Sequence, residues 1–177
     1  MELFAEFGFG STTMKDVAAR AEISPRGLIH HFPTKEDLLL GALEMHEARY
    51  TDHVPQAGNA DSIATLIVDT LANPRVTVEL HATLSAEATS RHHPAHEHYL
   101  ERYSALRGYL ELGFTELEKQ GKITPRSTPG ELAVMLIAVL DGAQLQWLYS
   151  PETIDLAAVV SGFFREIGFQ DDIAGVV

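Results

Sequence analysis

A short segment of the sequence, residues 24–32, carries side chains that suit contact with nucleic acid. It begins with Ser24-Pro25, an N-cap residue followed by proline at the first helical position. A helical wheel that turns Leu28 and Phe32 inward turns four other residues outward. They offer a cation, an imidazole, an apolar side chain and a glycine that allows close approach, which suits phosphates and base edges. These four residues are Arg26, Gly27, Ile29 and His30.

The preceding segment has the pattern of a second helix that would position the first. Between Thr13 and Ala21, apolar residues recur at the i, i+3, i+4 and i+7 spacing of an amphipathic helix. Only Glu22, Ile23 and Ser24 separate the two segments. Two short helices joined by so tight a turn are typical of a helix-turn-helix, whose second helix enters the major groove.

The rest of the chain also reads as helical, because strand-like alternation of β-branched residues is almost absent. Thr34 and Asp37 predict a capping box at the start of a third helix, and Ser150-Pro151 predicts the start of the last one. We expect further helices at about 35–50, 61–72, 74–91, 95–120, 129–148 and 152–168, with a polar connector over 51–60. The predicted fold is all-α. A three-helix helix-turn-helix module occupies residues 1–50, and a helical ligand-binding and dimerisation domain occupies 51–177.

Composition narrows the class of protein. The 177 residues are 45% hydrophobic, enough for a substantial core, and contain no cysteine. Disulfides, thiolate zinc sites and thiol nucleophiles are therefore excluded, and a cytoplasmic location is expected. The longest apolar run, Leu132 to Leu140, is closed by Asp141 and is too short to span a bilayer. No signal-peptide pattern is found, and no membrane partner is predicted.

The charge distribution is unusual for a protein that binds DNA. The formal net charge is −12, of which −3 falls on residues 1–50 and −9 on the remainder. A nucleic-acid-binding domain usually carries a basic surface. Contact with phosphates depends on the local positions of lysine and arginine. A negative net charge therefore does not by itself exclude DNA binding.

The N-terminal segment resembles the signature of the tetracycline-repressor (TetR) family over almost all of residues 3–39. The matching positions are Phe4-Ala5-Glu6-x-Gly8, then Thr12-Thr13-x-x-x-Val17-Ala18-x-x-Ala21-x-Ile23-Ser24, then Leu28-x-x-His31-Phe32-x-x-Lys35-Glu36-x-Leu38. A helix-turn-helix spacing alone is weak evidence, whereas this run of residue types at fixed offsets is specific.

The resemblance implies a DNA-contacting role for each matched position. Thr13 and Lys15 would touch the phosphate backbone, and Lys35 would bind phosphate with help from the positive end of its own helix. Thr13 could instead serve only as a cap, and His31 could be a packing residue. The implied DNA-binding residues are Thr13, Lys15, Ser24, Arg26, Gly27, Ile29, His30, His31 and Lys35.

Three features depart from the family pattern. Position 29 is usually tyrosine, whereas Ile29 can only make apolar contacts, such as one with a thymine methyl. Position 26 is often glycine or proline, so Arg26 could read guanine in a way particular to this chain. Met1 falls inside the expected first helix, and relatives carry a further turn or two and a basic arm before it. We therefore expect a segment upstream of Met1.

The last two helices are expected to form a dimer interface. Residues 132–147 are apolar nearly all round, which is typical of a helix buried in a core or between subunits. In the TetR family the last two helices pair with those of a second subunit as a four-helix bundle. The resemblance thus implies a two-fold homodimer with recognition helices roughly 34–36 Å apart.

A small-molecule effector is also implied by the resemblance, and no cofactor is expected. Polar side chains beside apolar stripes in the predicted helices 74–91, 95–120 and 129–148 could line its pocket. Ordinary core packing is the alternative for each of them. The candidate ligand-binding residues are His81, Ser85, Tyr99, Tyr103, Gln144 and Trp147.

A histidine cluster, His92-His93-x-x-His96-x-His98, raises the question of a metal site. Pro94 is expected to break the helix between these residues, so a solvated helix junction is favoured and no metal is predicted. No nucleophile and base have the spacing of a catalytic motif, and the chain is not expected to be an enzyme.

The sequence therefore predicts a transcriptional repressor that an effector releases from operator DNA. The alternative is a helical small-molecule-binding protein without effective DNA binding.

Overall fold

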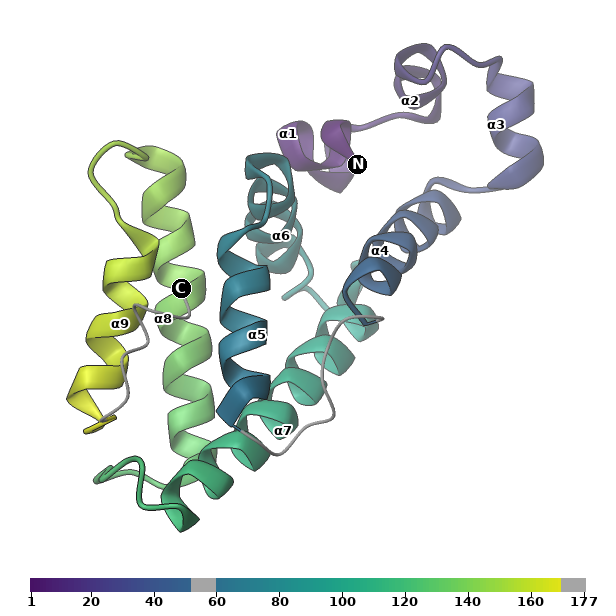
Figure 1. Ribbon diagram of the computed structural model, residues 1–177. Coiled ribbons are helices and arrows are strands. Elements are labelled where there is room, and N and C mark those ends of the chain that lie inside the picture. The colour runs from purple at the N-terminus through teal and green to yellow at the C-terminus, as the bar shows by residue number, and fades with distance from the viewer. Residues whose placement is uncertain (52–59, 170–177) are drawn as a thin grey trace. The chain divides into compact units, whose positions relative to one another are not determined.

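The computed structural model describes residues 1–51 and 60–169, which form α-helices and no strand (Figure 1). This confirms the predicted all-helical fold with an N-terminal helix-turn-helix. The helices are α1 (Glu2–Ser11), α2 (Met14–Arg20), α3 (Pro25–His31), α4 (Lys35–Thr51), α5 (Ala60–Leu71), α6 (Arg75–Glu87), α7 (His96–Lys119), α8 (Pro129–Tyr149) and α9 (Leu156–Glu166).

The chain divides into two compact units that are not contiguous in sequence. The first contains the described residues of Met1–Asp52 together with Arg75–Glu101, and the second those of His53–Pro74 and Arg102–Val177. Helix α6 and the first residues of α7 thus group with the helix-turn-helix helices. These units group residues by their contacts and do not test the predicted domains, 1–50 and 51–177. That domain division stays a prediction.

In the first unit, α1 packs against α6. Phe4 and Ala5 of α1 are buried, as are Leu80 and Leu84 of α6. The hydroxyl of Thr83 also donates a hydrogen bond of 3.1 Å to the carbonyl oxygen of Ala5. Apolar burial, which dominates such packing, therefore joins the first helix to residues some eighty positions later.

The start of α4 confirms the predicted capping box. The backbone N–H of Asp37 donates to Thr34 Oγ1 over 3.0 Å, and the N–H of Thr34 donates to Asp37 Oδ2 over 3.1 Å. Two N–H groups that the helix itself cannot satisfy thereby find acceptors. This cap sets where α4 begins, directly after the recognition segment.

The second unit has a continuous hydrophobic core built from four helices and the loop after α7. Helix α8 contributes five of the core residues, and the ring of Phe114 on α7 packs against those of Phe163 and Phe164 on α9 at ring-centroid distances of 6.2 Å. The buried residues of this core are Ile63, Ile67, Leu110, Phe114, Leu117, Ile123, Leu132, Ala133, Leu136, Ile137, Leu140, Val160, Phe164 and Ile167.

Two predicted helix ends were wrong. The last helix does not begin at Ser150-Pro151, because Ser150 is the C-cap of α8; α9 begins after Asp155, whose Oδ1 accepts from the N–H of Ala158 over 3.0 Å. Helix α6 ends at Glu87 rather than near residue 91, and turns occupy residues 88–95 before α7 begins. At the start of α9 the carboxylate of Asp155 supplies the N-cap. After α6 the N–H groups of Thr89 and Ser90 donate to the carbonyls of Ala86 and Glu87, three residues back, as in turns.

Helix α8 is long and apolar enough to cross a membrane by length and composition, although its longest uninterrupted apolar run is short. Core helices of water-soluble proteins meet the same criterion. Because six of its residues are buried, including Leu132, Leu136 and Leu140, we assign α8 to the core of the second unit.

Candidate nucleic-acid interface

The turn between α2 and α3 has the geometry that ends one helix and starts the next within a few residues. Glu22 lies in the left-handed region, with φ of +55°. The N–H of Ile23 donates to the carbonyl of Ala18 over 3.0 Å, and the N–H of Glu22 donates to that of Ala19 over 3.2 Å. This pair of bonds is a Schellman motif, which usually has glycine where Glu22 stands. The chain reverses sharply here, so α3 is presented as a separate helix.

Side-chain caps hold the starts of both helices. Thr13 Oγ1 accepts from the N–H of Asp16 over 3.2 Å, while Asp16 Oδ2 accepts from the N–H of Thr13 over 3.3 Å. At α3, Ser24 Oγ accepts from the N–H of Gly27 over 3.0 Å. Thr13 and Ser24 therefore have structural roles as caps, and their DNA contacts remain predictions.

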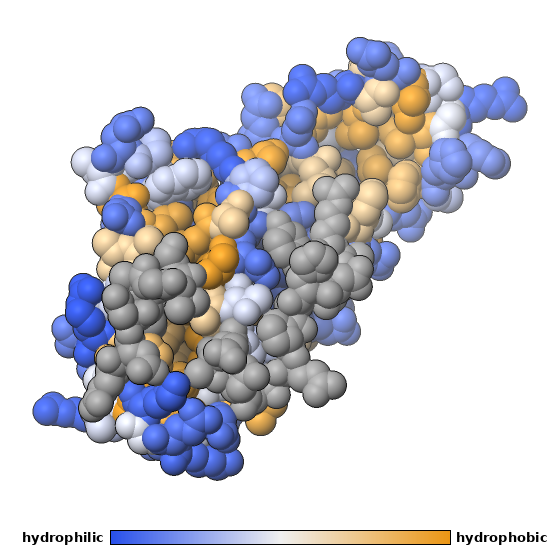
Figure 2. Space-filling view, in the orientation of Figure 1, coloured by the Kyte–Doolittle hydropathy of each residue, from blue (hydrophilic) through white to orange (hydrophobic). Residues whose placement is uncertain are grey.

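The outer side of the module presents the side chains that the sequence predicts for DNA. Figure 2 shows hydrophilic residues along the outer edge of α2 and α3. Leu28 is buried as predicted, and Phe32 lies against Gly41 of α4. The following predicted residues are exposed: Lys15, Arg26, Ile29, His30 and His31. Because His31 is exposed, the alternative that it packs in the core is wrong.

The cations of this module differ in what they already bind. Arg20 Nε donates to Glu2 Oε2 over 2.9 Å, so its charge is largely compensated by an acidic partner. This contact lowers the pKa of Glu2, since the hydrogen bond from Arg20 stabilises the carboxylate. Lys15 and Arg26 make no hydrogen bond or ion pair with the residues that the structure describes. They are the cations best placed to meet phosphates or bases.

Lys35 has a partner within the protein that the sequence did not reveal. Its Nζ donates to the carbonyl oxygen of Phe9 over 2.7 Å and lies 4.2 Å from the centre of the Phe9 ring. A second, longer contact of 3.4 Å joins Nζ to the carbonyl of Gly10. An ammonium group has three donors, so Lys35 can tie the end of α1 to the start of α4 and still donate to a phosphate.

Three predicted ligand-binding residues belong to the first unit. His81 Nδ1 lies 3.1 Å from the hydroxyl of Tyr99, so these two side chains share a hydrogen bond. Tyr99 is buried, whereas Ser85 on the next turn of α6 is half-buried. The structure thus brings His81 and Tyr99 together.

The other three predicted ligand-binding residues belong to the second unit. The Tyr103 hydroxyl donates to Asp141 Oδ2 over 2.8 Å, and Gln144 and Trp147 are half-buried on α8. Desolvation raises the pKa of Asp141, and the hydrogen bond from Tyr103 acts in the opposite direction. The assignment of all six residues to an effector site stays a prediction.

Sequence reasoning missed several polar neighbours of His81 and Tyr99. The buried ring of His46 lies 5.3 Å from that of His81, and the ring of His98 lies 5.3 Å from that of Tyr99. His98 Nε2 is also 3.3 Å from Glu47 Oε1. His98 precedes Tyr99 directly in the sequence, but the contacts of His46 with His81 and of Glu47 with His98 join different helices and form only in the folded chain.

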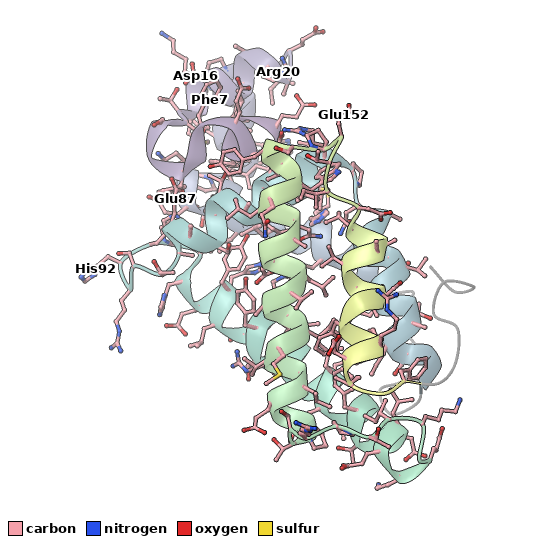
Figure 3. The ribbon with its side chains drawn as sticks, turned by 90° about the vertical axis from the view of Figure 1, so that its left-hand side faces the viewer. Phe7, Asp16, Arg20, Glu87, His92 and Glu152 are labelled. Carbon is pink, nitrogen blue, oxygen red and sulfur yellow. The ribbon has the colours of Figure 1, made fainter. Side chains whose placement is uncertain are left out.

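The histidines between α6 and α7 have separate surroundings. His92 extends away from the ribbon in Figure 3. His93 Nδ1 accepts from the N–H of Ala95 over 3.2 Å, and His96 Nδ1 lies 2.7 Å from the carbonyl of Ala88. Within the described part of the chain, no group of three or more histidine or acidic side chains could hold a metal ion.

The chain is all-helical, its helix-turn-helix is capped at the start of both helices, and its recognition helix is exposed. These features are those of helix-turn-helix DNA-binding regulators. Residues 1–42 match the family of bacterial regulatory proteins of the tetR type, and residues 59–166 match the C-terminal domain of BetI-type transcriptional repressors. The chain belongs to the TetR family of transcriptional regulators. The resemblance predicted from the sequence is thus confirmed, and so is the prediction that the chain is not an enzyme, because this family is one of regulators.

Among curated proteins, the chain is similar to the HTH-type transcriptional repressor KstR2 of Mycobacterium tuberculosis, with 37% identity over 95 residues. The match covers 51% of this chain and 40% of that repressor. The chain therefore aligns with less than half the length of this curated relative.

Solved structures share the fold over nearly the whole chain. A transcriptional regulator from Saccharomonospora viridis, in complex with choline, superposes with a TM-score of 0.77 at 22% identity, covering 96% of this chain and 93% of that one. The complex of SmeT with triclosan has a TM-score of 0.76 at 19% identity, covering 97% and 88%. SmeT is the repressor of a multidrug efflux pump of Stenotrophomonas maltophilia. At these identities the likeness concerns the fold.

Proposed function

We propose that this chain is a repressor that binds operator DNA through α2 and α3 and is released by a small-molecule effector. The observation that carries the proposal is the exposed face of α3. Arg26, Ile29 and His30 stand outward there on a helix whose start is capped by Ser24 and whose inner face is held by Leu28. A helix with this arrangement can place side chains against base edges while its body stays fixed on the protein.

The effector is supported by the C-terminal match and by polar groups inside the helical units. BetI-type repressors supply the matching family for residues 59–166, and two structures of similar fold hold choline and triclosan respectively. In the first unit, His81 shares a hydrogen bond with the buried Tyr99. In the second unit, Tyr103 donates a hydrogen bond to Asp141 at an exposed position. Such groups orient a ligand in a mostly apolar pocket, so we keep them as candidate effector contacts.

The dimer is supported by an apolar face of α8 that the described residues leave open. Val134, Leu145 and Tyr149 fall on one side of this helix and are exposed by 52%, 49% and 84%. On α9, Val159 is 40% exposed. Exposed apolar residues gathered on one face are typical of a subunit interface. We propose that α8 and α9 pair with those of a second copy, and that this homodimer works on chromosomal DNA in the cytoplasm.

A gel-shift experiment tests the proposal. The full chain is titrated against the intergenic DNA upstream of its own gene at two salt concentrations. We expect sequence-specific binding that weakens as salt rises, because phosphate contacts release counterions. Arg26→Ala should weaken it by about 1–3 kcal/mol, roughly 5- to 160-fold in Kd. Arg107→Ala, at an exposed arginine of α7, is the matched control and should bind as the wild type does.

The outcome also decides between repressor and plain ligand-binding protein. Binding that Arg26→Ala weakens and Arg107→Ala does not supports the repressor. Binding that does not distinguish operator from unrelated DNA, or that is absent, supports a helical small-molecule-binding protein without effective DNA binding.

A further inference from the structure

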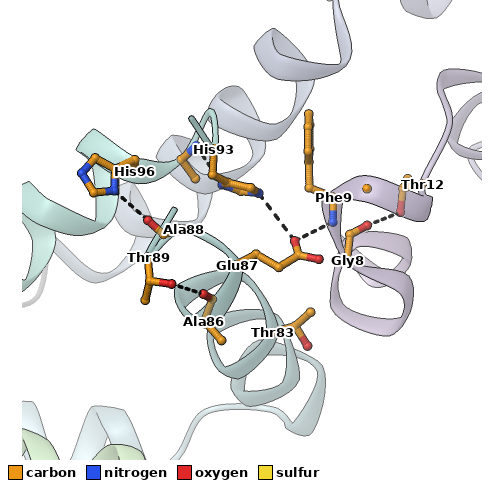
Figure 4. A network of polar contacts seen from close by, with 12 residues as sticks. Gly8, Phe9, Thr12, Thr83, Ala86, Glu87, Ala88, Thr89, His93 and His96 are labelled. Carbon is orange, nitrogen blue, oxygen red and sulfur yellow. Dashed lines mark hydrogen bonds and ion pairs between the residues drawn. The ribbon is translucent and has the colours of Figure 1, made fainter. Parts of the chain in front are cut away.

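Glu87, the last residue of α6, contacts the backbone of α1 at its kink. Its Oε2 accepts a hydrogen bond of 2.8 Å from the N–H of Phe9 (Figure 4). The kink lies at Gly8, which is buried and has φ of +71°. A Cβ at position 8 would collide with Glu87 Oε1. The carboxylate therefore occupies space that only glycine leaves open, and Figure 3 shows Glu87 beside the α1 ribbon.

The same short stretch of α1 holds Lys35. While Glu87 binds the N–H of Phe9, the Phe9 carbonyl accepts from Lys35 Nζ over 2.7 Å, and the Phe9 ring lies beneath the ammonium group. Lys35 is the first residue of α4 and follows the recognition helix after Phe32, Pro33 and Thr34. A single residue, Phe9, thus connects the end of α6 with a cation next to the recognition helix.

Several neighbouring groups surround the Glu87 carboxylate and the kink. His93 Nδ1 accepts from the N–H of Ala95, so in the neutral ring the proton sits on Nε2, which lies 3.5 Å from Glu87 Oε2. The His93 ring also stacks edge-on against the Phe9 ring at 5.2 Å. On the other side of the kink, the buried hydroxyl of Thr12 donates to the carbonyl of Gly8 over 2.8 Å.

We propose that Glu87 is a positioning residue for DNA binding, which holds Phe9 so that Lys35 is aimed at the phosphate backbone. The inference rests on the proposed function, because it assigns Glu87 a role in operator binding. Glu87 itself does not touch DNA. Its carboxylate fixes the backbone at the kink, and the carbonyl of Phe9 then fixes the ammonium group of Lys35. Without this anchor Lys35 loses its defined position and its share in phosphate binding.

Operator affinity of the full chain, measured by fluorescence anisotropy over a range of salt, tests the role of Glu87. Glu87→Ala should weaken binding by about 2- to 30-fold, the range of coupling through residues that do not touch ligand. It should also reduce the slope of log K against log salt by about 0.9, the loss of one phosphate contact. Glu79→Ala is the matched control, because Glu79 lies on α6 but pairs with Arg75 on the surface. It should leave both quantities unchanged.

A double-mutant cycle with Lys35→Met separates positioning from general destabilisation. If Glu87 acts through Lys35, Glu87→Ala adds no further loss of affinity in the Lys35→Met background. Equal losses in both backgrounds, or an unchanged salt slope, overturn the proposal. Glu87→Gln keeps an oxygen that can accept from Phe9 and should bind DNA as the wild type does. Glu87→Asp, shorter by one methylene, should lose affinity.

Two checks distinguish a loss of positioning from a folding defect, and a failure of this inference from a failure of the proposed function. Circular dichroism and thermal unfolding establish that each variant is folded; if Glu87→Ala is not, the comparison of Glu87→Gln with Glu87→Asp decides the proposal. If the wild-type chain itself does not bind its operator, that result contradicts both the proposed function and this inference. If the wild type binds and all Glu87 variants bind equally well, only the inference falls.

Discussion

Ser24 lies where local folding and DNA contact would use the same hydroxyl group. Its Oγ accepts from the N–H of Gly27 over 3.0 Å and the residue is exposed. A hydroxyl has one donor and two acceptor sites, so it can cap α3 through a lone pair and still donate its proton to a phosphate. The two roles can be separated by substitution.

Ser24→Ala removes both roles and Ser24→Asp removes only one. We expect Ser24→Ala to lower the free energy of unfolding by about 1 kcal/mol, the usual cost of losing an N-cap. Ser24→Asp should restore most of that stability, because aspartate caps as well as serine, yet bind operator DNA more weakly than Ser24→Ala, because an ionised carboxylate cannot donate and repels phosphate. Urea unfolding and fluorescence anisotropy measure the two quantities. Tight DNA binding by Ser24→Asp would contradict a phosphate contact at this position.

At the scale of the element, the turn between α2 and α3 carries a strained residue. Glu22 has φ of +55°, a conformation in which a Cβ crowds the following carbonyl. The hydrogen bonds of the Schellman motif on either side compensate for that strain. The tight connection between the two helices therefore depends on backbone geometry more than on the glutamate side chain.

Glycine at position 22 should stabilise the turn. Glu22→Gly is expected to raise the free energy of unfolding by about 0.5–1 kcal/mol, since relief of strain exceeds the added freedom of the unfolded chain. Glu22→Ala removes the same charge but keeps the Cβ, and it should change stability by less than about 0.5 kcal/mol. Thermal unfolding of both variants gives the comparison. Equal stabilisation by alanine would show that charge, not strain, is responsible.

Helix α8 begins with a capping box whose strength depends on pH. Glu131 Oε2 accepts from the N–H of Thr128 over 2.8 Å and from its hydroxyl over 2.9 Å. These bonds lower the pKa of Glu131 below its ordinary value of 4.5, the backbone bond being the larger cause. A carboxyl whose pKa is depressed by folding stabilises the protein above its ordinary pKa, and that contribution is lost as pH falls through the folded value.

Glu131→Gln should therefore change the acid limb of the stability curve. Wild type is expected to lose stability more steeply than Glu131→Gln as pH falls below about 4.5, because glutamine keeps the cap but does not titrate. Thr128→Ala should cost about 1 kcal/mol at neutral pH. Thermal melts between pH 3 and 7 measure both effects, with Glu118→Gln on the exposed side of α7 as control. Parallel curves for wild type and Glu131→Gln would contradict the prediction.

At the scale of the whole molecule, the proposed function needs two recognition helices. One helix-turn-helix reads one half-site, and a two-fold dimer places the second about one DNA turn away. The exposed apolar face of α8 is the surface in the described chain that best accounts for such pairing.

A charge on that face should break the dimer. Leu145→Glu, at a position 49% exposed on α8, is expected to yield a folded monomer and to weaken operator binding at least tenfold, because a buried unpaired carboxylate costs several kcal/mol. Leu112→Glu on α7, at a position 55% exposed, is the control and should remain dimeric. Light scattering at micromolar concentration measures the mass. A monomeric wild type, or a dimeric Leu145→Glu, would contradict the predicted interface.

Signals close together in sequence were sufficient to predict the helix-turn-helix. Ser24 caps α3 by accepting from the N–H of Gly27, three positions later, and Thr34 caps α4 in the same way by accepting from the N–H of Asp37. Capping and helical periodicity depend on residues a turn or two apart, so a single sequence displays them. Helix ends were less predictable: Asp155, not Ser150, caps α9.

The long-range contacts around Lys35 could not be predicted, because they join residues that are close together only in the folded chain. The bond between Glu87 and Phe9 joins residues 78 positions apart, and that between Lys35 and Phe9 joins residues 26 apart. No periodicity links such pairs, since each depends on how apolar faces pack and where a glycine leaves room for a carboxylate. The sequence by itself was sufficient to predict that the chain is helical and to name candidate residues for DNA contact. Only the tertiary structure showed that α6 groups with the N-terminal helices and that Lys35 Nζ donates a hydrogen bond to the carbonyl oxygen of Phe9.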